Sequence, residues 1–236
     1  FGCRNYKLLH ISSFICALNL ERIHQKVNNF KKVGRKSVIK KRYVDLKLKE
    51  KYTIKLLVYF QKHGLNDFSM SKLASDFNIS KTTLYNHFDS KESMIDAAVV
   101  YKLNSINDYK TVLFDKDLDY FERLRKAMLF YCVQIFEMSR NLLKEVKEEY
   151  PKSWHKVVLF QQQMLHELQD YYKLGQRIGH YHNEFEVDLL VANDQSFFLW
   201  LSQYYFPEKY NHDIVFIVNQ YCRLKFEGIR EKLNKR

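Results

Sequence analysis

The segment from residue 69 to residue 91 constrains the fold of this chain more than any other, because its pattern predicts two short helices joined by a tight turn. In the first helix the apolar residues recur at spacings of three, one and three, which places them on one face: Met70, Leu73, Ala74 and Phe77. The turn follows with Asn78, which tolerates left-handed backbone, then Ile79 and Ser80, whose hydroxyl can cap the next helix. The segment is therefore typical of a helix-turn-helix.

The second helix of this segment is unusually polar. Only Leu84 and Phe88, four residues apart, face inward. The other side chains are of the kinds that hydrogen-bond phosphates and base edges: Lys81, Thr82, Thr83, Tyr85, Asn86 and His87. A helix-turn-helix whose second helix carries such a face predicts DNA binding.

These residues resemble the signature of the tetracycline-repressor (TetR) family of transcriptional regulators. The resemblance rests on runs of residues at fixed spacing: Leu73-Ala74, Ile79-Ser80, Thr83-Leu84-Tyr85-Asn86-His87-Phe88 and Ser90-Lys91-Glu92. It extends upstream through a helix near residues 44 to 62 and downstream to Tyr101. The chain departs from the usual pattern at Asn78, where members usually carry Gly, and at Phe68-Ser69, where a Thr pair is common.

The resemblance implies an all-α fold with three parts. Residues 1–43 would form a basic N-terminal arm and residues 44–110 a three-helix, helix-turn-helix DNA-binding domain. Residues 111–236 would form a helical bundle that binds a ligand and dimerises. The composition agrees with this fold class, because two Pro and six Gly among 236 residues favour a largely helical chain.

The expected DNA-binding residues come from the motif and the start of the helix after it: Ser69, Lys81, Thr82, Thr83, Tyr85, Asn86, His87 and Lys91. Ser69 can cap the first motif helix. We assign the two Thr residues and Asn86 to base edges or nearby phosphates, and the two Lys residues to phosphates. Tyr85 and His87 are assigned to backbone contacts that fix the register of the protein on DNA.

The positive charge is concentrated at the N-terminus. Residues 1–43 contain eleven Lys/Arg and one acidic residue, whereas residues 111–236 contain eighteen of each sign. The basic run 31–42 fits either a flexible arm that follows phosphates or a solvated leader, and whether residues 1–42 belong to the native protein stays open. The apolar stretch 8–20 is too short to span a bilayer, so no membrane partner and a cytoplasmic location are expected.

After about residue 110, apolar residues recur every three or four positions and predict helices near 118–135, 142–149, 152–178, 187–206 and 212–233. The last two are so apolar that little polar face remains. Because a helix that is apolar all round must be covered on all sides, they are expected to pair with a second copy of the chain. Asp194 interrupts this apolar stripe, and could orient a ligand, pair across the dimer or lie at its rim.

These features predict a homodimeric transcriptional regulator, a repressor released from a palindromic operator when a small apolar or aromatic effector binds. An effector between the helices around 118–178 would move the helix near 90–109 and change the separation of the two recognition helices. The alternative is the same DNA-binding motif controlled by a protein partner. A closed, fully packed second domain would favour control by a protein partner, whereas an internal cavity would favour control by a small effector.

An enzyme is not expected. His180, His182 and Glu184 alternate in a predicted loop, and residues 44–236 contain no Glu-x-x-His pair. The chain also has no phosphate-binding glycine loop or Gly-x-Ser-x-Gly turn. The four Cys residues form no metal-ligand spacing, and a reduced chain with incidental thiols is the simplest account. We therefore assign no catalytic residue, metal or cofactor.

Overall fold

The computed structural model describes residues 45–66, 68–138, 140–204 and 213–228, and these ranges contain helices and no strand. This confirms the predicted all-α fold class. The basic arm falls outside the described residues, as do parts of the two helices expected near 187–206 and 212–233.

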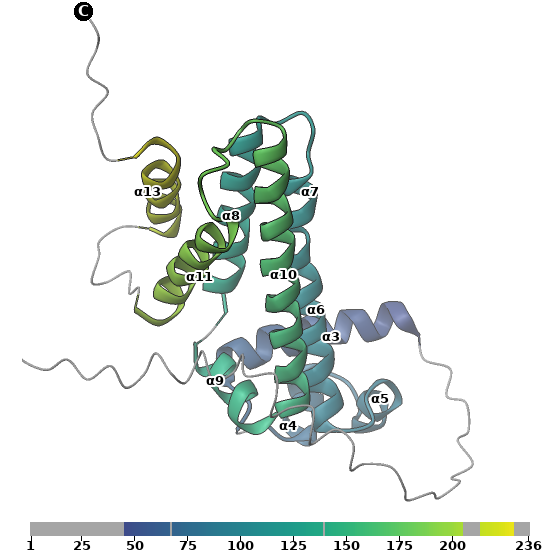
Figure 1. The fold of residues 1–236 in the computed structure, drawn as a ribbon. Helices are drawn as coiled ribbons and strands as arrows, with labels where there is room; N and C mark the ends of the chain where they lie inside the picture. Colours follow the sequence, from purple (N-terminus) through teal and green to yellow (C-terminus); the bar gives the residue numbers. More distant parts are fainter. Residues whose placement is uncertain (1–44, 67, 139, 205–212, 229–236) are drawn as a thin grey trace, which may run out of the picture. The chain divides into compact units, whose positions relative to one another are not determined.

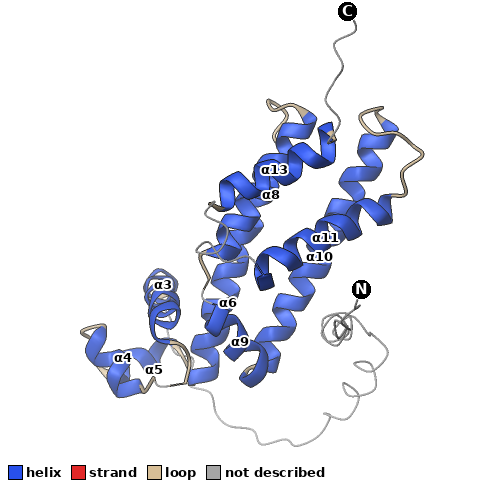
Figure 2. Ribbon diagram, turned by 90° about the vertical axis from the view of Figure 1, so that its left-hand side faces the viewer, coloured by secondary structure: helices blue, strands red, loops and turns tan. Residues whose placement is uncertain are grey.

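The first four described helices include the predicted motif (Figures 1 and 2): α3 (Leu46–His63), α4 (Met70–Asp76), α5 (Lys81–His87) and α6 (Lys91–Asn107). Serine caps form as the sequence predicts, because the hydroxyl oxygens of Ser69 and Ser80 accept hydrogen bonds from the backbone N–H groups of Lys72 and Thr83. The turn between α4 and α5 passes through Asn78 at φ +55°, in the left-handed region where Asn replaces the family's usual Gly.

The remaining described helices follow in order: α7 (Tyr109–Leu113), α8 (Tyr120–Phe136), α9 (Arg140–Glu149), α10 (Pro151–Arg177), α11 (Val187–Tyr204) and α13 (Ile214–Glu227). The short helix α7 was not predicted, because one turn and a half is too short to show a periodic pattern. Pro151 occupies the first turn of α10, where its missing N–H costs no hydrogen bond.

The buried apolar side chains form two clusters. The first joins α3, α4, α5 and the first half of α6, and it also contains Leu142 and Val146 of α9. The second lies among α8, α10, α11 and α13, and begins on α6 at Ile106. Helix α6 therefore contributes buried side chains to both clusters and connects them.

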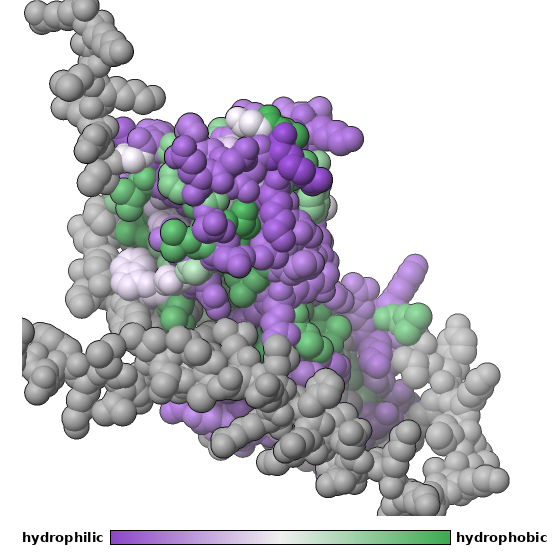
Figure 3. Space-filling model, in the orientation of Figure 1, coloured by the Kyte–Doolittle hydropathy of each residue, from purple (hydrophilic) through white to green (hydrophobic). Residues whose placement is uncertain are grey.

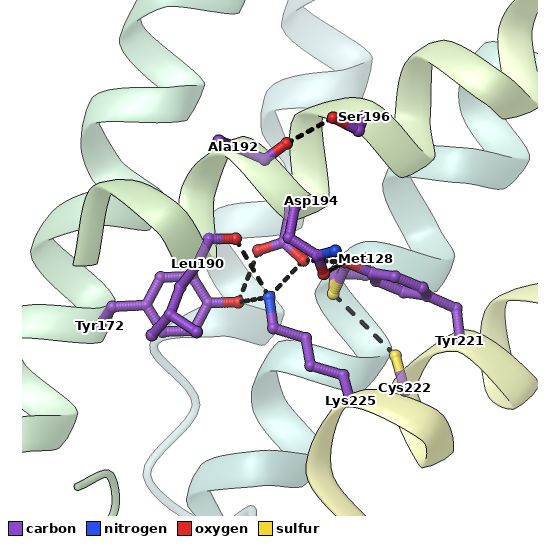
Figure 4. A network of polar contacts seen from close by, with 10 residues as sticks. Met128, Tyr172, Leu190, Ala192, Asp194, Ser196, Tyr221, Cys222 and Lys225 are labelled. Atoms are coloured by element: carbon purple, nitrogen blue, oxygen red, sulfur yellow. Dashed lines mark hydrogen bonds and ion pairs between the residues drawn. The ribbon is translucent and has the colours of Figure 1, made fainter. Parts of the chain in front are cut away.

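A buried ion pair joins the last two described helices (Figure 4). Asp194 of α11 is fully buried, and its carboxylate lies 2.5 Å from Nζ of Lys225 on α13. The hydroxyl groups of Tyr172 and Tyr221 donate to the same carboxylate at 2.5 and 2.7 Å. Asp194 thus has its partners within one chain, which is a different outcome from the three that its sequence position suggested.

The ion pair also perturbs the groups around it. Burial lowers the pKa of Lys225, and the attraction of Asp194 opposes that shift. Burial, with the neighbouring carboxylate, raises the pKa of Tyr172 far above its usual range. Such pKa shifts are expected where charged groups are buried in an apolar cluster. The hydrogen bonds donated to Asp194 offset the energetic cost of burying its charge.

Within the described ranges, no helix is long and apolar enough to cross a membrane.

Candidate nucleic-acid interface

Helix α5 is anchored by two apolar side chains, one within it and one at its C-cap, and exposes several polar side chains. Leu84 and Phe88 are buried in the first cluster. Lys81, Thr82 and Asn86 are exposed, and Tyr85 is 41% exposed. A short helix that is anchored along one edge presents its polar side chains in a fixed direction, as readout of a DNA groove requires.

Thr83 differs from its neighbours on α5. Its side chain is half-buried, and its hydroxyl lies 2.9 Å from the hydroxyl of Ser80, which also caps the helix through the Thr83 backbone N–H. The structure therefore gives Thr83 a place in the helix cap that the sequence assignment to base edges did not include.

His87 packs against α3. Its ring lies 5.3 Å from the ring of Tyr52, centroid to centroid, and its Nδ1 atom is buried with no hydrogen-bond partner in the described part of the chain. Of the two ring nitrogens, Nε2 is therefore the one left for a contact with a phosphate.

Ser69 and Lys91 lie at the starts of α4 and α6. Ser69 is the N-cap of α4, with its side chain exposed. Lys91 is the first residue of α6, and its Nζ lies 4.5 Å from the centroid of the Phe68 ring. The N-terminus of α6 is capped by reciprocal hydrogen bonds between Ser90 and Ser93, and the Lys91 side chain is exposed.

The loop that leads into α4 is held by a residue far along the chain. Glu145 of α9 accepts hydrogen bonds from the backbone N–H of Leu65 and from the side-chain amide of Asn66. Gly64 precedes them at φ +73°, and a Cβ there would lie 3.0 Å from the Glu145 carboxylate oxygens. This contact was not predicted, because no local pattern links residues separated by eighty positions.

Of the residues considered for catalysis, His180 packs on an aromatic ring. His180 stacks on Tyr120 with ring centroids 4.6 Å apart, and no group of three or more potential metal ligands occurs in the described ranges. Cys132 and Cys222 are buried, and burial raises the pKa of Cys222 to about 11 and that of Cys132 further still. At neutral pH both are protonated thiols, which are weak nucleophiles.

Comparison with known proteins assigns the sequence of this motif to a family. The model of "Bacterial regulatory proteins, tetR family" matches residues 57–98, from the second half of α3 into α6. A curated relative, an HTH-type transcriptional regulator of Staphylococcus aureus, is 27% identical over 136 residues, which are 57% of this chain and 70% of the relative. The chain belongs to the TetR family. This TetR-family protein is thus a DNA-binding transcriptional regulator.

Solved structures share the fold of this TetR-family regulator beyond its DNA-binding motif. The regulator PfmR from Thermus thermophilus has a TM-score of 0.60 at 20% identity, over 76% of this chain and 98% of that one. A TetR/AcrR-family regulator from Thermobifida fusca has a TM-score of 0.62 at 17% identity, over 77% and 98%. The fatty acid degradation regulator FadR from Bacillus halodurans has a TM-score of 0.57 at 17% identity, over 86% and 100%.

Proposed function

We propose that this TetR-family regulator is a homodimeric repressor that binds a palindromic DNA site and leaves it when a small apolar or aromatic molecule binds among its C-terminal helices. The domain division at residues 43 and 110, the cytoplasmic location and the individual DNA contacts belong to the same proposal.

The observation that carries the proposal is the apolar surface of α11 and α13. Leu189 is 65% exposed, and Val215, Phe216 and Leu224 are each more than 40% exposed. In Figure 3, hydrophobic side chains reach the surface over these helices on the left of the view, whereas the surface over α10 is largely hydrophilic. In a two-fold dimer, the same surface of a second chain covers this apolar surface. The dimer then presents two α5 helices to successive major grooves of the DNA.

Within each proposed half-site, the polar face of α5 makes the contacts. Lys81, Thr82 and Asn86 are exposed, whereas Leu84 is buried. Their chemistry suits base edges and phosphates, and Tyr85 and His87 follow at the end of the helix for contacts to the DNA backbone. The proposed set of DNA-contacting residues is completed by Thr83, Ser69 and Lys91.

The class of effector is proposed from the second cluster and from the names of structural neighbours. The cluster includes aromatic side chains from α8 and α10, such as Tyr131, Phe160 and Tyr171. Neighbours of the same fold include the Bacillus halodurans fatty acid degradation regulator and a ketosteroid regulator of Mycobacterium tuberculosis, the latter with a TM-score of 0.54. An apolar molecule seated between α8 and α10 would displace α6, which packs against both helices.

Control by a protein partner is the second candidate, and a different surface favours it. An open hollow of about 830 Å³ lies at the end of α10, lined by charged and amide side chains: Asp170, Lys173, Gln176, Arg177 and Asn183. Ile178 and Phe185, each 53% exposed, lie next to these residues in the chain. An open hollow lined by charged and amide residues, with exposed apolar residues near them in the chain, is more typical of a protein contact than of a site that encloses an apolar molecule.

Fluorescence anisotropy with the duplex directly upstream of the gene, compared with a scrambled duplex, tests the proposal. The upstream duplex should bind more tightly, the Tyr85→Ala variant should lose the difference, and a chain without residues 1–42 should keep it. Adding long-chain acyl and steroid compounds to the preformed complex should release the DNA. Equal binding to both duplexes would contradict the proposal, and release only by a protein fraction would favour the second candidate.

A further inference from the structure

Three lysine side chains lie over aromatic rings that mark the ends of the motif helices. Nζ of Lys91 lies 4.5 Å from the centroid of Phe68, just before α4, and Nζ of Lys55 lies 5.5 Å from that of Phe77, where α4 ends. Nζ of Lys49 lies 5.6 Å from the centroid of Phe88, which caps the C-terminal end of α5. Two of these lysines, Lys49 and Lys55, belong to α3 and lie outside the recognised motif.

Lys49 is placed at the end of the recognition helix that is expected to meet the DNA backbone. One turn further along α3, Tyr52 packs on His87. Side chains from the first turns of α3 therefore reach the last turn of α5 and its C-cap. The two helices lie near each other in Figures 1 and 2. A helix in the major groove has phosphates on either side, so a group carried beside its end meets a phosphate rather than a base.

The charge of Lys49 is available for such a contact. Its side chain is half-buried along the Phe88 ring, and it takes part in no ion pair within the described part of the chain. A lysine stem that is already held on a ring loses less side-chain freedom when its ammonium group binds a phosphate. The ammonium is a compact charge, which suits a phosphate without selecting a base.

We infer that Lys49 of α3 is a phosphate-contacting residue of the DNA interface, acting beside Tyr85 and His87 at the C-terminal end of α5. This inference deepens the proposed function, and it rests on the part of that proposal in which α5 enters the major groove. The competing explanation is structural, because a lysine at this place also complements the negative end of the α5 dipole and packs on Phe88.

The salt dependence of DNA binding separates these explanations. Each phosphate contact contributes about 0.9 to the slope of log K against log salt, so its loss weakens binding roughly eightfold near 0.1 M salt. Lys49→Met keeps the apolar stem on Phe88 and removes the charge. We expect this variant to lower the magnitude of the slope by about 0.9 and to weaken binding to upstream and scrambled duplexes by the same factor. Lys49→Arg should restore both.

Lys62→Met is the matched control. Lys62 is exposed in the last turn of the same helix, and thirteen residues of helix place it about 20 Å from Lys49, two Debye lengths at 0.1 M salt. The control makes the same change in net charge and should leave the slope unchanged. Thermal unfolding of each variant reports any structural effect of the substitution.

Any of the following outcomes would overturn the inference. An unchanged slope for Lys49→Met, with or without a lower Tm, would make Lys49 a packing residue only. Equal slope changes in Lys49→Met and Lys62→Met would reduce the effect to net charge. The wild-type chain could prefer the upstream duplex while Lys49→Met binds with the same affinity and the same salt slope as the wild type. The proposed function would then survive, and the Lys49 contact alone would fail. If the wild-type chain binds neither duplex, both are contradicted.

Discussion

The adjacent residues Thr82 and Thr83 have the same side chain and different surroundings. Thr82 is exposed, whereas Thr83 is half-buried with its hydroxyl 2.9 Å from that of Ser80. We expect Thr82→Val to weaken DNA binding by about 1–3 kcal/mol if it meets a base edge, with no change in stability. Thr83→Val should lower the free energy of unfolding by about 0.5–1.5 kcal/mol through the lost hydrogen bond. Urea unfolding and DNA titration of both variants check this, and equal stabilities would contradict it.

Gly175 is a residue whose role depends on a distant side chain. A Cβ at this position in α10 would lie 2.3 Å from the Tyr181 ring and 2.8 Å from the Tyr120 hydroxyl. Helix propensity alone would make Gly175→Ala stabilising by about 1 kcal/mol, but the clash should make it destabilising by about 1–3 kcal/mol. Urea unfolding measures the difference. In a Tyr181→Ala background the same substitution should cost clearly less, since only the Tyr120 hydroxyl then lies too close. An equal cost in both backgrounds would contradict the clash with Tyr181.

Sequence reasoning at the residue scale succeeded where the cause is local. The Ser80 cap and the left-handed Asn78 follow from neighbours in the chain, and both are confirmed. The contact between the Tyr181 ring and Gly175 was not predicted. That contact depends on how the chain turns back after α10, which spacing alone does not give.

At the scale of elements, the Asp194–Lys225 pair is the clearest device that fixes one helix against another. Removing one partner leaves a buried charge unpaired, so Asp194→Asn and Lys225→Met should each cost about 3–5 kcal/mol of unfolding free energy. The double variant should cost clearly less than the sum of the two. Urea unfolding of all three measures this coupling.

Arg223 and Glu227 provide the matched control on the same helix. Their side chains are 71% and 60% exposed, so solvent screens their attraction, and Arg223→Ala should change stability by less than about 1 kcal/mol. If the Asp194 and Lys225 substitutions were simply additive, the two groups would not act as a pair, and the alignment of α11 on α13 would depend on apolar packing alone.

Helix positions were largely predictable, and helix partners were not. Apolar periodicity placed α8, α10, α11 and α13, because burial of one face gives each its own pattern. The same patterns gave no indication that Leu142 and Val146 of α9 would join the cluster of the DNA-binding helices. Any apolar stripe can pack on any other, and the choice depends on loop lengths and on single polar contacts such as Glu145 to Leu65.

At the scale of the whole molecule, the predicted dimer is the step on which regulation depends. Leu224 is 52% exposed on α13, on the proposed two-fold interface. A Leu224→Glu substitution would place a carboxylate in that interface twice, once from each copy, because a two-fold contact repeats every change. We expect the variant to elute as a monomer in size-exclusion chromatography with light scattering. Leu159→Glu is the control, since Leu159 is equally exposed but lies on α10.

The same variant links assembly to function. Two α5 helices held in one dimer bind a palindrome with an effective concentration that a single helix lacks, so the monomer should lose about 10²–10⁴-fold in affinity for the upstream duplex. Its binding to scrambled DNA should fall far less, since that binding depends on phosphate contacts within each copy. A Leu224→Glu monomer that keeps full affinity and preference for the upstream duplex would mean that one motif suffices. Regulation would then have to act on α5 itself rather than on the spacing between two copies.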